Sequence, residues 1–506
     1  MSSVDAAVGD GAQLADSSLP ADHAGDELKR GAVVSTIALL ASNFRGIFTF
    51  LVARLLGPAA LGMYSVAWAN LELISKIAVF GMDNAITTFI ARAEAVGDHI
   101  RSRALFQIAV AIALGQSLLI GGIAITAIRL FGDRLSLPQE MLSAVVFILG
   151  ALPGVALYRV SNSVSWGMKV MKHDIFSRGI TESVVTTLTF LVAYFIGFKK
   201  FAPELAAIGG TTSCGLVALG LAAKLFKNTP SSHGTVSART EAQRLLAYGA
   251  PISAHQLLTA LIYRLDVIML GFFVGRAPGV TLATVGVYGA ALEVAGGLRK
   301  VNQAFNPIFT PLIAGMTATG EDKRAAATYA RLAQWMLWIL LPLIAVMLLA
   351  GTSILLLYGP AFRQGAAWLT IVAVGCAMNS YVSFGETIIM VQRPRLNLFH
   401  SCISCVIAVA ANLWLIPRYG AMGAAFGLLT PYLTQGLLRF IALRFVFKWR
   451  NPWSNLAPPF IAAAIAFVPA IICRALIAGI IGQIAAAALF LAIFGLEWKL
   501  YSRANS

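Results

Sequence analysis

The sequence predicts an all-α polytopic membrane protein with about fourteen transmembrane helices, arranged as two six-helix lobes and an extra C-terminal helix pair. Three observations support this prediction. Only 12% of the 506 residues are charged and 58% are hydrophobic, whereas a soluble domain carries about 25% charged residues. Apolar runs of membrane-spanning length recur from one end of the chain to the other. In addition, the same short sequence pattern occurs near the start of one predicted span in each half of the chain.

The apolar runs define the individual spans, because each is close to the roughly 20 residues that a bilayer requires. The predicted spans are 32–55, 62–82, 104–128, 141–163, 176–197, 203–225, 245–274, 281–315, 333–358, 366–390, 397–416, 421–446, 457–477 and 479–498. Most of the 38 Lys and Arg residues fall in alternate connecting segments. The positive-inside rule therefore predicts that both termini lie in the cytoplasm, and it also accounts for most of the net charge of +16.

An internal repeat divides the chain. The stretch LGMYSVAWA begins at Leu61 and VGVYGAALE begins at Val285, and a weaker echo pairs residues 204–211 with 420–427. Repeated halves are common in transporters, whose substrate site lies between them. The predicted organisation is a disordered cytoplasmic tail (1–31), an N-terminal lobe (32–226), a cytoplasmic inter-lobe loop (227–244), a C-terminal lobe (245–450) and the extra helix pair with a short tail (451–506).

The first span contains a permanent charge. Arg45 lies about 21 Å along a helix that starts near residue 31, beyond the centre of the bilayer. It shares a helical stripe with Ser35, Ser42 and Thr49. An arginine at this depth costs at least a few kcal/mol unless it is paired or hydrated. We therefore expect the stripe to face protein or a water-filled cavity.

Spans seven and eight carry further polar stripes at helical spacing. In span seven these are Gln256, Thr259, Tyr263 and Asp266; in span eight they are Tyr288, Arg299, Asn302 and Asn306 on one face, and Glu293, Lys300 and Gln303 on another. The predicted substrate-binding residues are Arg45, Thr49, Tyr263, Arg299, Lys300, Asn302 and Asn306, and the candidates for H⁺ or Na⁺ coupling are Asp266 and Glu293.

The alternative is that these charges only pair with one another and fix the helix bundle. Glu72 and Lys76 are four residues apart in the favourable order and are expected to pair along their own helix. Arg264 lies nearly opposite Asp266 on the helix, so these two are not expected to pair. Catalytic motifs, phosphate-binding glycine loops, metal-ligand clusters and nucleic-acid-binding patterns are absent from the sequence, which predicts neither an enzyme nor a resident cofactor.

Three stretches resemble polysaccharide and O-antigen flippases of the multidrug/oligosaccharidyl-lipid/polysaccharide (MOP) superfamily, whose fold is shared by the MATE exporters. They are LVARLLGPAALGMYSVAWA at 51–69, LLLYGPAFRQGAAWLTIVAVG at 355–375 and the segment at 393–427. The resemblance implies a flippase for undecaprenyl-pyrophosphate-linked oligosaccharides that works by alternating access through a cationic central cavity. Arg45 matches a basic residue frequent in helix one of this family, and Asp266 matches an acidic residue frequent in helix seven.

The same resemblance implies partners and competing functions. The partners are the lipid-linked oligosaccharide, the bilayer and, in polysaccharide assembly, a polymerase and a chain-length regulator. A cation-coupled multidrug exporter would favour acidic over basic cavity residues. A lipid II flippase would use the same chemistry with another headgroup. A membrane-embedded polymerase or ligase would need a large catalytic loop, and the loops here are short.

Overall fold

The computed structural model describes residues 46–135, 137–230, 237–302, 309, 313, 315–316, 319–449 and 453–504. Throughout these residues the regular elements are helices. The predicted tail (1–31), most of the first predicted span, Arg45 and Asn306 lie outside the described residues.

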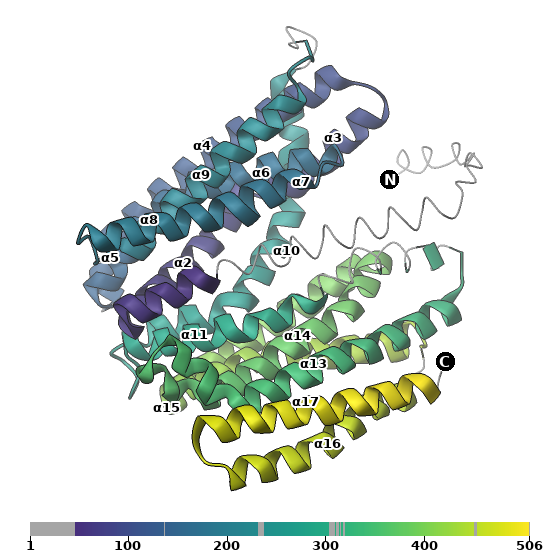
Figure 1. Cartoon of the computed structure of the whole chain (residues 1–506). Coiled ribbons are helices and arrows are strands. Elements are labelled where there is room, and N and C mark those ends of the chain that lie inside the picture. Colours follow the sequence, from purple (N-terminus) through teal and green to yellow (C-terminus); the bar gives the residue numbers. More distant parts are fainter. Residues whose placement is uncertain are drawn as a thin grey trace.

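The N-terminal half forms one helix bundle, drawn in purple to blue-green in Figure 1. It consists of a short apolar helix Gly46–Leu56, α2 (Pro58–Val79), α3 (Met82–Ala95), α4 (His99–Phe131), α5 (Gln139–Ile148), α6 (Leu152–Gly167), α7 (Lys172–Asp174), the π-helix η3 (Ile175–Glu182), α8 (Ser183–Phe195) and α9 (Ala202–Leu225), with 3₁₀ turns η1 (Gly132–Leu135) and η2 (Leu149–Ala151). Its centre is the contact of α6 with α9, where Gly154 and Gly215 bring the two backbones close together.

The C-terminal half forms a second bundle, drawn in teal to yellow (Figure 1). It consists of α10 (Ala238–Phe272), α11 (Leu282–Arg299), α13 (Asp322–Tyr358), the 3₁₀ turn η4 (Pro360–Gly365), α14 (Ala366–Gln392), α15 (Pro394–Ile441), the π-helix η5 (Ala442–Val446), α16 (Trp453–Leu476) and α17 (Gly479–Ala504). The last two helices pack on each other and on α13. Helix α10 begins earlier than predicted, because Ser237 caps it and accepts a hydrogen bond from the backbone N–H of Thr240.

Fewer helices than the sequence predicted have the length and the hydropathy of a membrane span. Within the described residues, ten helices are long and apolar enough to cross a bilayer, or eleven if α2 and α3, which meet at an angle of 43°, count as one span. The predicted count of fourteen is therefore not confirmed. The predicted spans that are missing from this set fall on the short helix Gly46–Leu56, on α11 and on the second arm of α15, which continues past a break at Gly420 (φ 56°).

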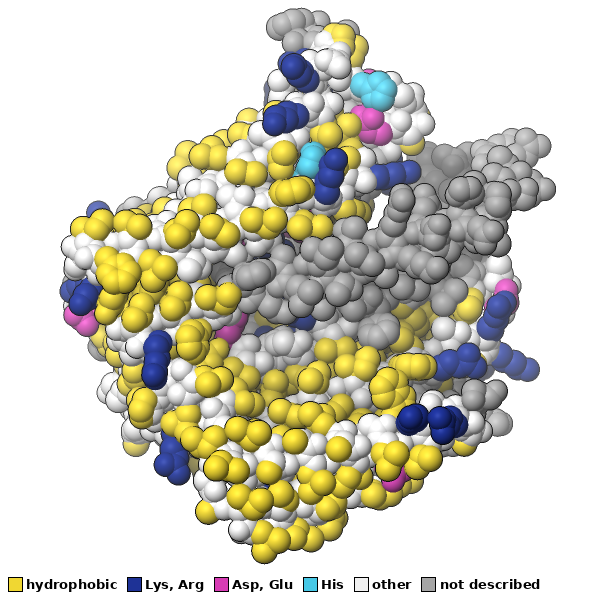
Figure 2. Space-filling model, viewed as in Figure 1, with side chains coloured by type: hydrophobic (Ala, Val, Ile, Leu, Met, Phe, Trp, Pro, Cys, Tyr) yellow, Lys and Arg dark blue, Asp and Glu magenta, His cyan; other side chains and the backbone are white. Residues whose placement is uncertain are grey.

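The outer surface fits a lipid environment. Figure 2 shows hydrophobic side chains spread over the visible face of both bundles, with Lys and Arg gathered mainly toward its margins. Leu118, Leu119 and Leu130 of α4 are each more than half exposed. An apolar surface of this extent would be unstable in water, but it is favourable in contact with lipid.

The repeated sequence pattern marks the crossing of the two halves. Gly62 of α2 and Gly286 of α11 occupy equivalent places in the repeat, and they face each other. A Cβ atom on Gly62 would collide with the carbonyl oxygen of Leu282, and one on Gly286 with that of Pro58. Small residues permit this backbone-to-backbone approach. The repeat thus produces a close helix crossing between the bundles.

Helix α10 connects the bundles over its whole length. It packs against α2, α3 and α4 of the first bundle and against α15 of the second, and Figure 1 shows it crossing between them. Near its start, Arg101 of α4 donates two hydrogen bonds, of 3.0 and 3.1 Å, to the carboxylate of Glu241. Farther along, Gly249 lies against the backbone of Gly81. The helix is therefore held by both halves.

Candidate substrate cavity

A cavity of about 860 Å³ lies between the two bundles. Its walls come from the short helix Gly46–Leu56, α2, η3, α8 and α9 on one side and from α10, α11 and α14 on the other. Both aromatic side chains (Phe48, Tyr64, Trp68 and Tyr358) and hydroxyl side chains (Thr49, Thr186, Thr211 and Thr259) line it. Such a wall offers both apolar contact and hydrogen bonds to a polar ligand.

Most of the residues predicted to bind substrate, where they are described, line this cavity. Thr49, Tyr263, Arg299, Lys300 and Asn302 all do so, and so does Glu293, which was predicted for ion coupling. These side chains thus border one cavity, and their roles in substrate binding and ion coupling stay predictions. Asp266 does not belong to the lining and is only 2% exposed.

Arg299 is the best-placed anion-binding group. Its guanidinium carbon lies 5.3 Å from the ring centre of Tyr263 and 5.8 Å from that of Tyr432. Its Nε and Nη2 atoms are buried, yet they donate to no described residue. Burying N–H groups of a guanidinium without acceptors is costly. Donors held in this way between two aromatic rings, at a cavity wall, are ready to bind an anion.

Asp266 instead takes part in a buried contact beside the cavity. The Tyr288 hydroxyl donates a 2.6 Å hydrogen bond to its Oδ2 and lies 3.4 Å from the carbonyl oxygen of Ala424. The other carboxylate oxygen, Oδ1, is buried and has no hydrogen-bond partner among the described residues. Tyr288 occupies the place in the repeat that Tyr64 holds in α2.

Charges also pair across the cavity. Arg264 of α10 donates a 2.7 Å hydrogen bond from Nε to Oε2 of Glu72 in α2. The expected pair of Glu72 with Lys76 is thus wrong as a salt bridge, since the structure records the ion pair of Glu72 with Arg264 and none with Lys76. The reason is packing: α10 brings a guanidinium to the face of α2 that Glu72 occupies. As expected, Arg264 does not pair with Asp266.

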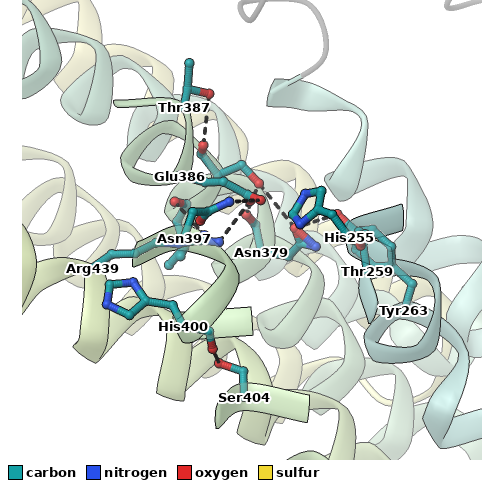
Figure 3. Close-up of polar contacts among 12 residues, drawn as sticks. His255, Thr259, Tyr263, Asn379, Glu386, Thr387, Asn397, His400, Ser404 and Arg439 are labelled. Atoms are coloured by element: carbon teal, nitrogen blue, oxygen red, sulfur yellow. Dashed lines mark hydrogen bonds and ion pairs between the residues drawn. The ribbon is translucent and has the colours of Figure 1, made fainter. Parts of the chain in front are cut away.

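A second polar cluster lies behind the cavity wall of the C-terminal bundle, and Figure 3 shows it. Arg439, only 3% exposed, forms a 2.9 Å ion pair with Glu386 and donates to the carbonyl oxygen of Val382. Asn397 donates to the other oxygen of Glu386 at 3.4 Å, and the Tyr263 hydroxyl donates to Asn379 at 3.3 Å. The sequence analysis assigned no role to Arg439 or Glu386, although two opposite charges within apolar runs are a signal for such a pair.

The charge of the cavity wall is mixed. Among the described lining residues, the carboxylates are Glu72, Asp174, Glu182, Glu293 and Glu386, and the cations are Arg178, Arg264, Arg299 and Lys300. A uniformly cationic cavity, as the resemblance implied, is therefore not found in the described part of the chain. Of these cations, Arg264 is already paired with Glu72, and Arg299 and Lys300 lie side by side on the wall of the C-terminal bundle.

Solved structures with the same fold are membrane transporters. An inward-facing MATE multidrug resistance transporter of the MOP superfamily is 15% identical, over 80% of this chain and 94% of that one, with a TM-score of 0.69. The lipid II flippase MurJ in an inward closed conformation is 12% identical, over 93% and 98%, with a TM-score of 0.70. The MATE transporter VcmN of Vibrio cholerae is 17% identical, over 83% and 99%, with a TM-score of 0.56.

Two helical bundles that enclose a polar cavity give this chain the fold of these solved transporters. No curated protein shows significant similarity to the chain. The family model for polysaccharide biosynthesis proteins matches residues 28–316, which is more than half of the sequence, and the chain belongs to that family.

Proposed function

We propose that the protein is a flippase that moves undecaprenyl-pyrophosphate-linked oligosaccharide repeat units across the bacterial inner membrane for surface polysaccharide synthesis. The observation that carries this proposal is Arg299, whose two buried N–H donors lie at the wall of the inter-bundle cavity without an acceptor among the described residues. Membership of the polysaccharide biosynthesis family supports the choice of a saccharide-bearing substrate.

The chemistry of the substrate fits the wall. A pyrophosphate carries about two negative charges and is bound well by arginine, which donates in a fixed fork geometry. Lys300 and Asn302 lie beside Arg299 in the lining. The hydroxyl and aromatic side chains of the same cavity can hold sugar rings without covalent chemistry. Moving such a headgroup requires a hydrated path between two halves that open alternately.

A coupling cation would act at a carboxylate. We assign this role to Asp266, which keeps one oxygen without a partner among the described residues, with Glu293 of the cavity lining as the alternative. Transport would then depend on an H⁺ or Na⁺ gradient. In this proposal both termini lie in the cytoplasm, and a polymerase and a chain-length regulator act on the product outside.

A multidrug exporter is the competing function, and the five carboxylates of the described lining favour it. A lipid II flippase is a second alternative with the same pyrophosphate chemistry. Deleting the gene and extracting the membrane lipids tests all three. We expect undecaprenyl-linked oligosaccharide to accumulate on the cytoplasmic side while surface polysaccharide is lost. Unchanged glycans with new sensitivity to cationic drugs would support the exporter, and accumulation of lipid II would support the second alternative.

A further inference from the structure

The wall of the N-terminal bundle carries a charged face that the proposed function does not yet use. Asp174, Arg178 and Glu182 follow one another at intervals of four residues along α7 and η3, and all three line the cavity. Residues four apart on a helix lie on one face. The segment Ile175–Glu182 is π-helical, a rare conformation that is frequent at functional sites.

Glu182 presents its carboxylate to the cavity. The residue is 8% exposed and lines the cavity, and its oxygens are not among the buried atoms that lack a hydrogen-bond partner. No hydrogen bond or ion pair joins its side chain to another residue in the described ranges. The carboxylate can therefore accept hydrogen bonds from a ligand in the cavity.

Asp174 is oriented by a buried network. Asn162 of α6 donates a 2.8 Å hydrogen bond to its Oδ1, and Ser177 donates at 3.1 Å to the side-chain oxygen of Asn162. Ser177 also donates to the backbone carbonyl of His173, whose Nδ1 lies 2.9 Å from the hydroxyl of Ser165. Asn162, Ser165 and Ser177 are all at most 2% exposed. One carboxylate oxygen is thus fixed, and the side chain borders the cavity.

Part of this polar pattern recurs in the sequence of the C-terminal bundle. The stretch NSVSWG at 162–167 matches NSYVSFG at 379–385 with one extra residue, and His173 with Ser177 matches His400 with Ser404. The serine donates a 2.8 Å hydrogen bond to the histidine carbonyl in both bundles, and Figure 3 shows this contact for His400 and Ser404. The side-chain contacts of Asn162 and His173 have no counterpart there among the described residues, and Nδ1 of His400 has no partner among them.

The three charges belong to the N-terminal bundle alone. Counted from the histidine, the places of Asp174, Arg178 and Glu182 are taken in the C-terminal bundle by Ser401, Cys405 and Val409. The matching segment is thus uncharged at all three places, so the charged face at the cavity wall is specific to the N-terminal half.

Resting on the flippase function proposed above, we infer that the face of Asp174, Arg178 and Glu182 is the saccharide-recognition surface of the cavity. Its carboxylates accept hydrogen bonds from sugar hydroxyls, and Arg178 donates to sugar oxygens. The guanidinium of Arg178 on the same face disfavours a metal cation as the occupant. Arg299, on the opposite bundle, holds the pyrophosphate. The face therefore determines which repeat unit is transported.

Binding to two probes tests this inference. The first is undecaprenyl pyrophosphate, which has no sugar, and the second is the lipid-linked oligosaccharide extracted from the deletion strain. The full-length protein is purified in detergent, and binding is followed by intrinsic fluorescence, to which Trp68 of the cavity wall contributes. The variants are Glu182→Gln, Asp174→Asn and Arg299→Gln. Glu140→Gln is the matched control, because Glu140 is exposed and outside the cavity lining.

We expect Glu182→Gln and Asp174→Asn each to weaken binding of the lipid-linked oligosaccharide about tenfold or more, as for the loss of a hydrogen bond to a charged group. Their binding of undecaprenyl pyrophosphate should change less than about twofold, while Arg299→Gln should weaken both probes. The thermal unfolding midpoint of each variant shows whether it is folded. Having two independent carboxylate variants keeps the test valid if one of them fails to fold.

Three results would overturn the inference. If both carboxylate variants bind the oligosaccharide like the wild type, or lose both probes equally, the face does not recognise sugar. If the wild type binds the two probes with equal affinity, the cavity does not read the saccharide, although the flippase function stands. If the wild type binds neither probe, the flippase proposal fails and the recognition surface fails with it.

Discussion

Arg264 of α10 and Glu72 of α2 form a 2.7 Å ion pair that joins the two halves of the chain at the wall of the cavity. Both side chains are about one quarter exposed, at 28% and 27%. An alternating-access cycle moves the halves relative to each other. If the pair breaks in that motion, it stabilises the conformation seen here over the alternative one.

Reversing one of these charges tests the role of the pair. Arg264→Glu places two carboxylates together, and we expect it to reduce transport strongly. The exchange Glu72→Arg with Arg264→Glu restores opposite charges and should recover part of the activity. A partly exposed pair contributes about 0.2–1 kcal/mol, so Arg264→Gln alone should shift the conformational equilibrium no more than about fivefold. Surface polysaccharide in a complemented deletion strain is the measurement. A double variant as inactive as Arg264→Glu would argue against a pairing role.

The glycine crossing of α2 and α11 gives a second prediction. Gly286→Ala places a Cβ atom against the carbonyl oxygen of Pro58, so the helices must separate. Overpacking of this kind costs about 1–3 kcal/mol, and we expect a lower thermal unfolding midpoint together with reduced transport. Gly296→Ala is the matched control in the same helix, because nothing lies within 4 Å of the added Cβ atom. Equal midpoints for the two variants would show that the crossing tolerates separation.

The sequence contained the repeat with Gly62 and Gly286, but it did not predict that the two glycines meet at a helix crossing. Helical spacing predicted which residues of α10 and α11 share a face. Arg299 and Asn302 border the cavity, whereas Tyr288 of the same predicted stripe is buried away from it. What spacing does not give is the identity of the neighbouring helix.

Three residues show this limit. Glu72 has a suitable partner four residues away on its own helix, but α10 presents Arg264 to it at 2.7 Å. Asp266 lies one turn from Tyr263 on the predicted stripe, but Tyr288 covers it, so it is buried beside the cavity instead of lining it. Glu182 lies near the start of the predicted span 176–197, and the structure places it at the end of η3 in the cavity lining. Each outcome depends on tertiary packing.

The pair of the buried Arg439 and the partly exposed Glu386 predicts a loss of stability. Arg439→Met leaves the carboxylate of Glu386, whose side chain is 27% exposed, with only a 3.4 Å hydrogen bond from Asn397, and the cost of about 3–5 kcal/mol for removing one partner of a fully buried pair is the upper limit. We expect a lower unfolding midpoint, and partial recovery in the double variant with Glu386→Gln. Arg324→Met is the control, since its pair with Glu321 is exposed and should matter little. If both single variants have similar unfolding midpoints, water replaces Arg439 as the partner of the Glu386 carboxylate.

Ion coupling at Asp266 is the last prediction. Its Oδ2 is held by Tyr288, while its Oδ1 has no partner in the described part of the chain, so a proton or a sodium ion is the missing counterpart. Asp266→Asn keeps the size and the hydrogen bond from Tyr288 but removes the charge. We expect transport in proteoliposomes to lose its dependence on the H⁺ or Na⁺ gradient. If Asp266 alone couples transport to the ion gradient, Glu293→Gln at the cavity wall should leave the gradient dependence intact. If Glu293 is the coupling residue, the same substitution should abolish that dependence. Undiminished gradient-driven transport after both substitutions together would remove both carboxylates from the mechanism.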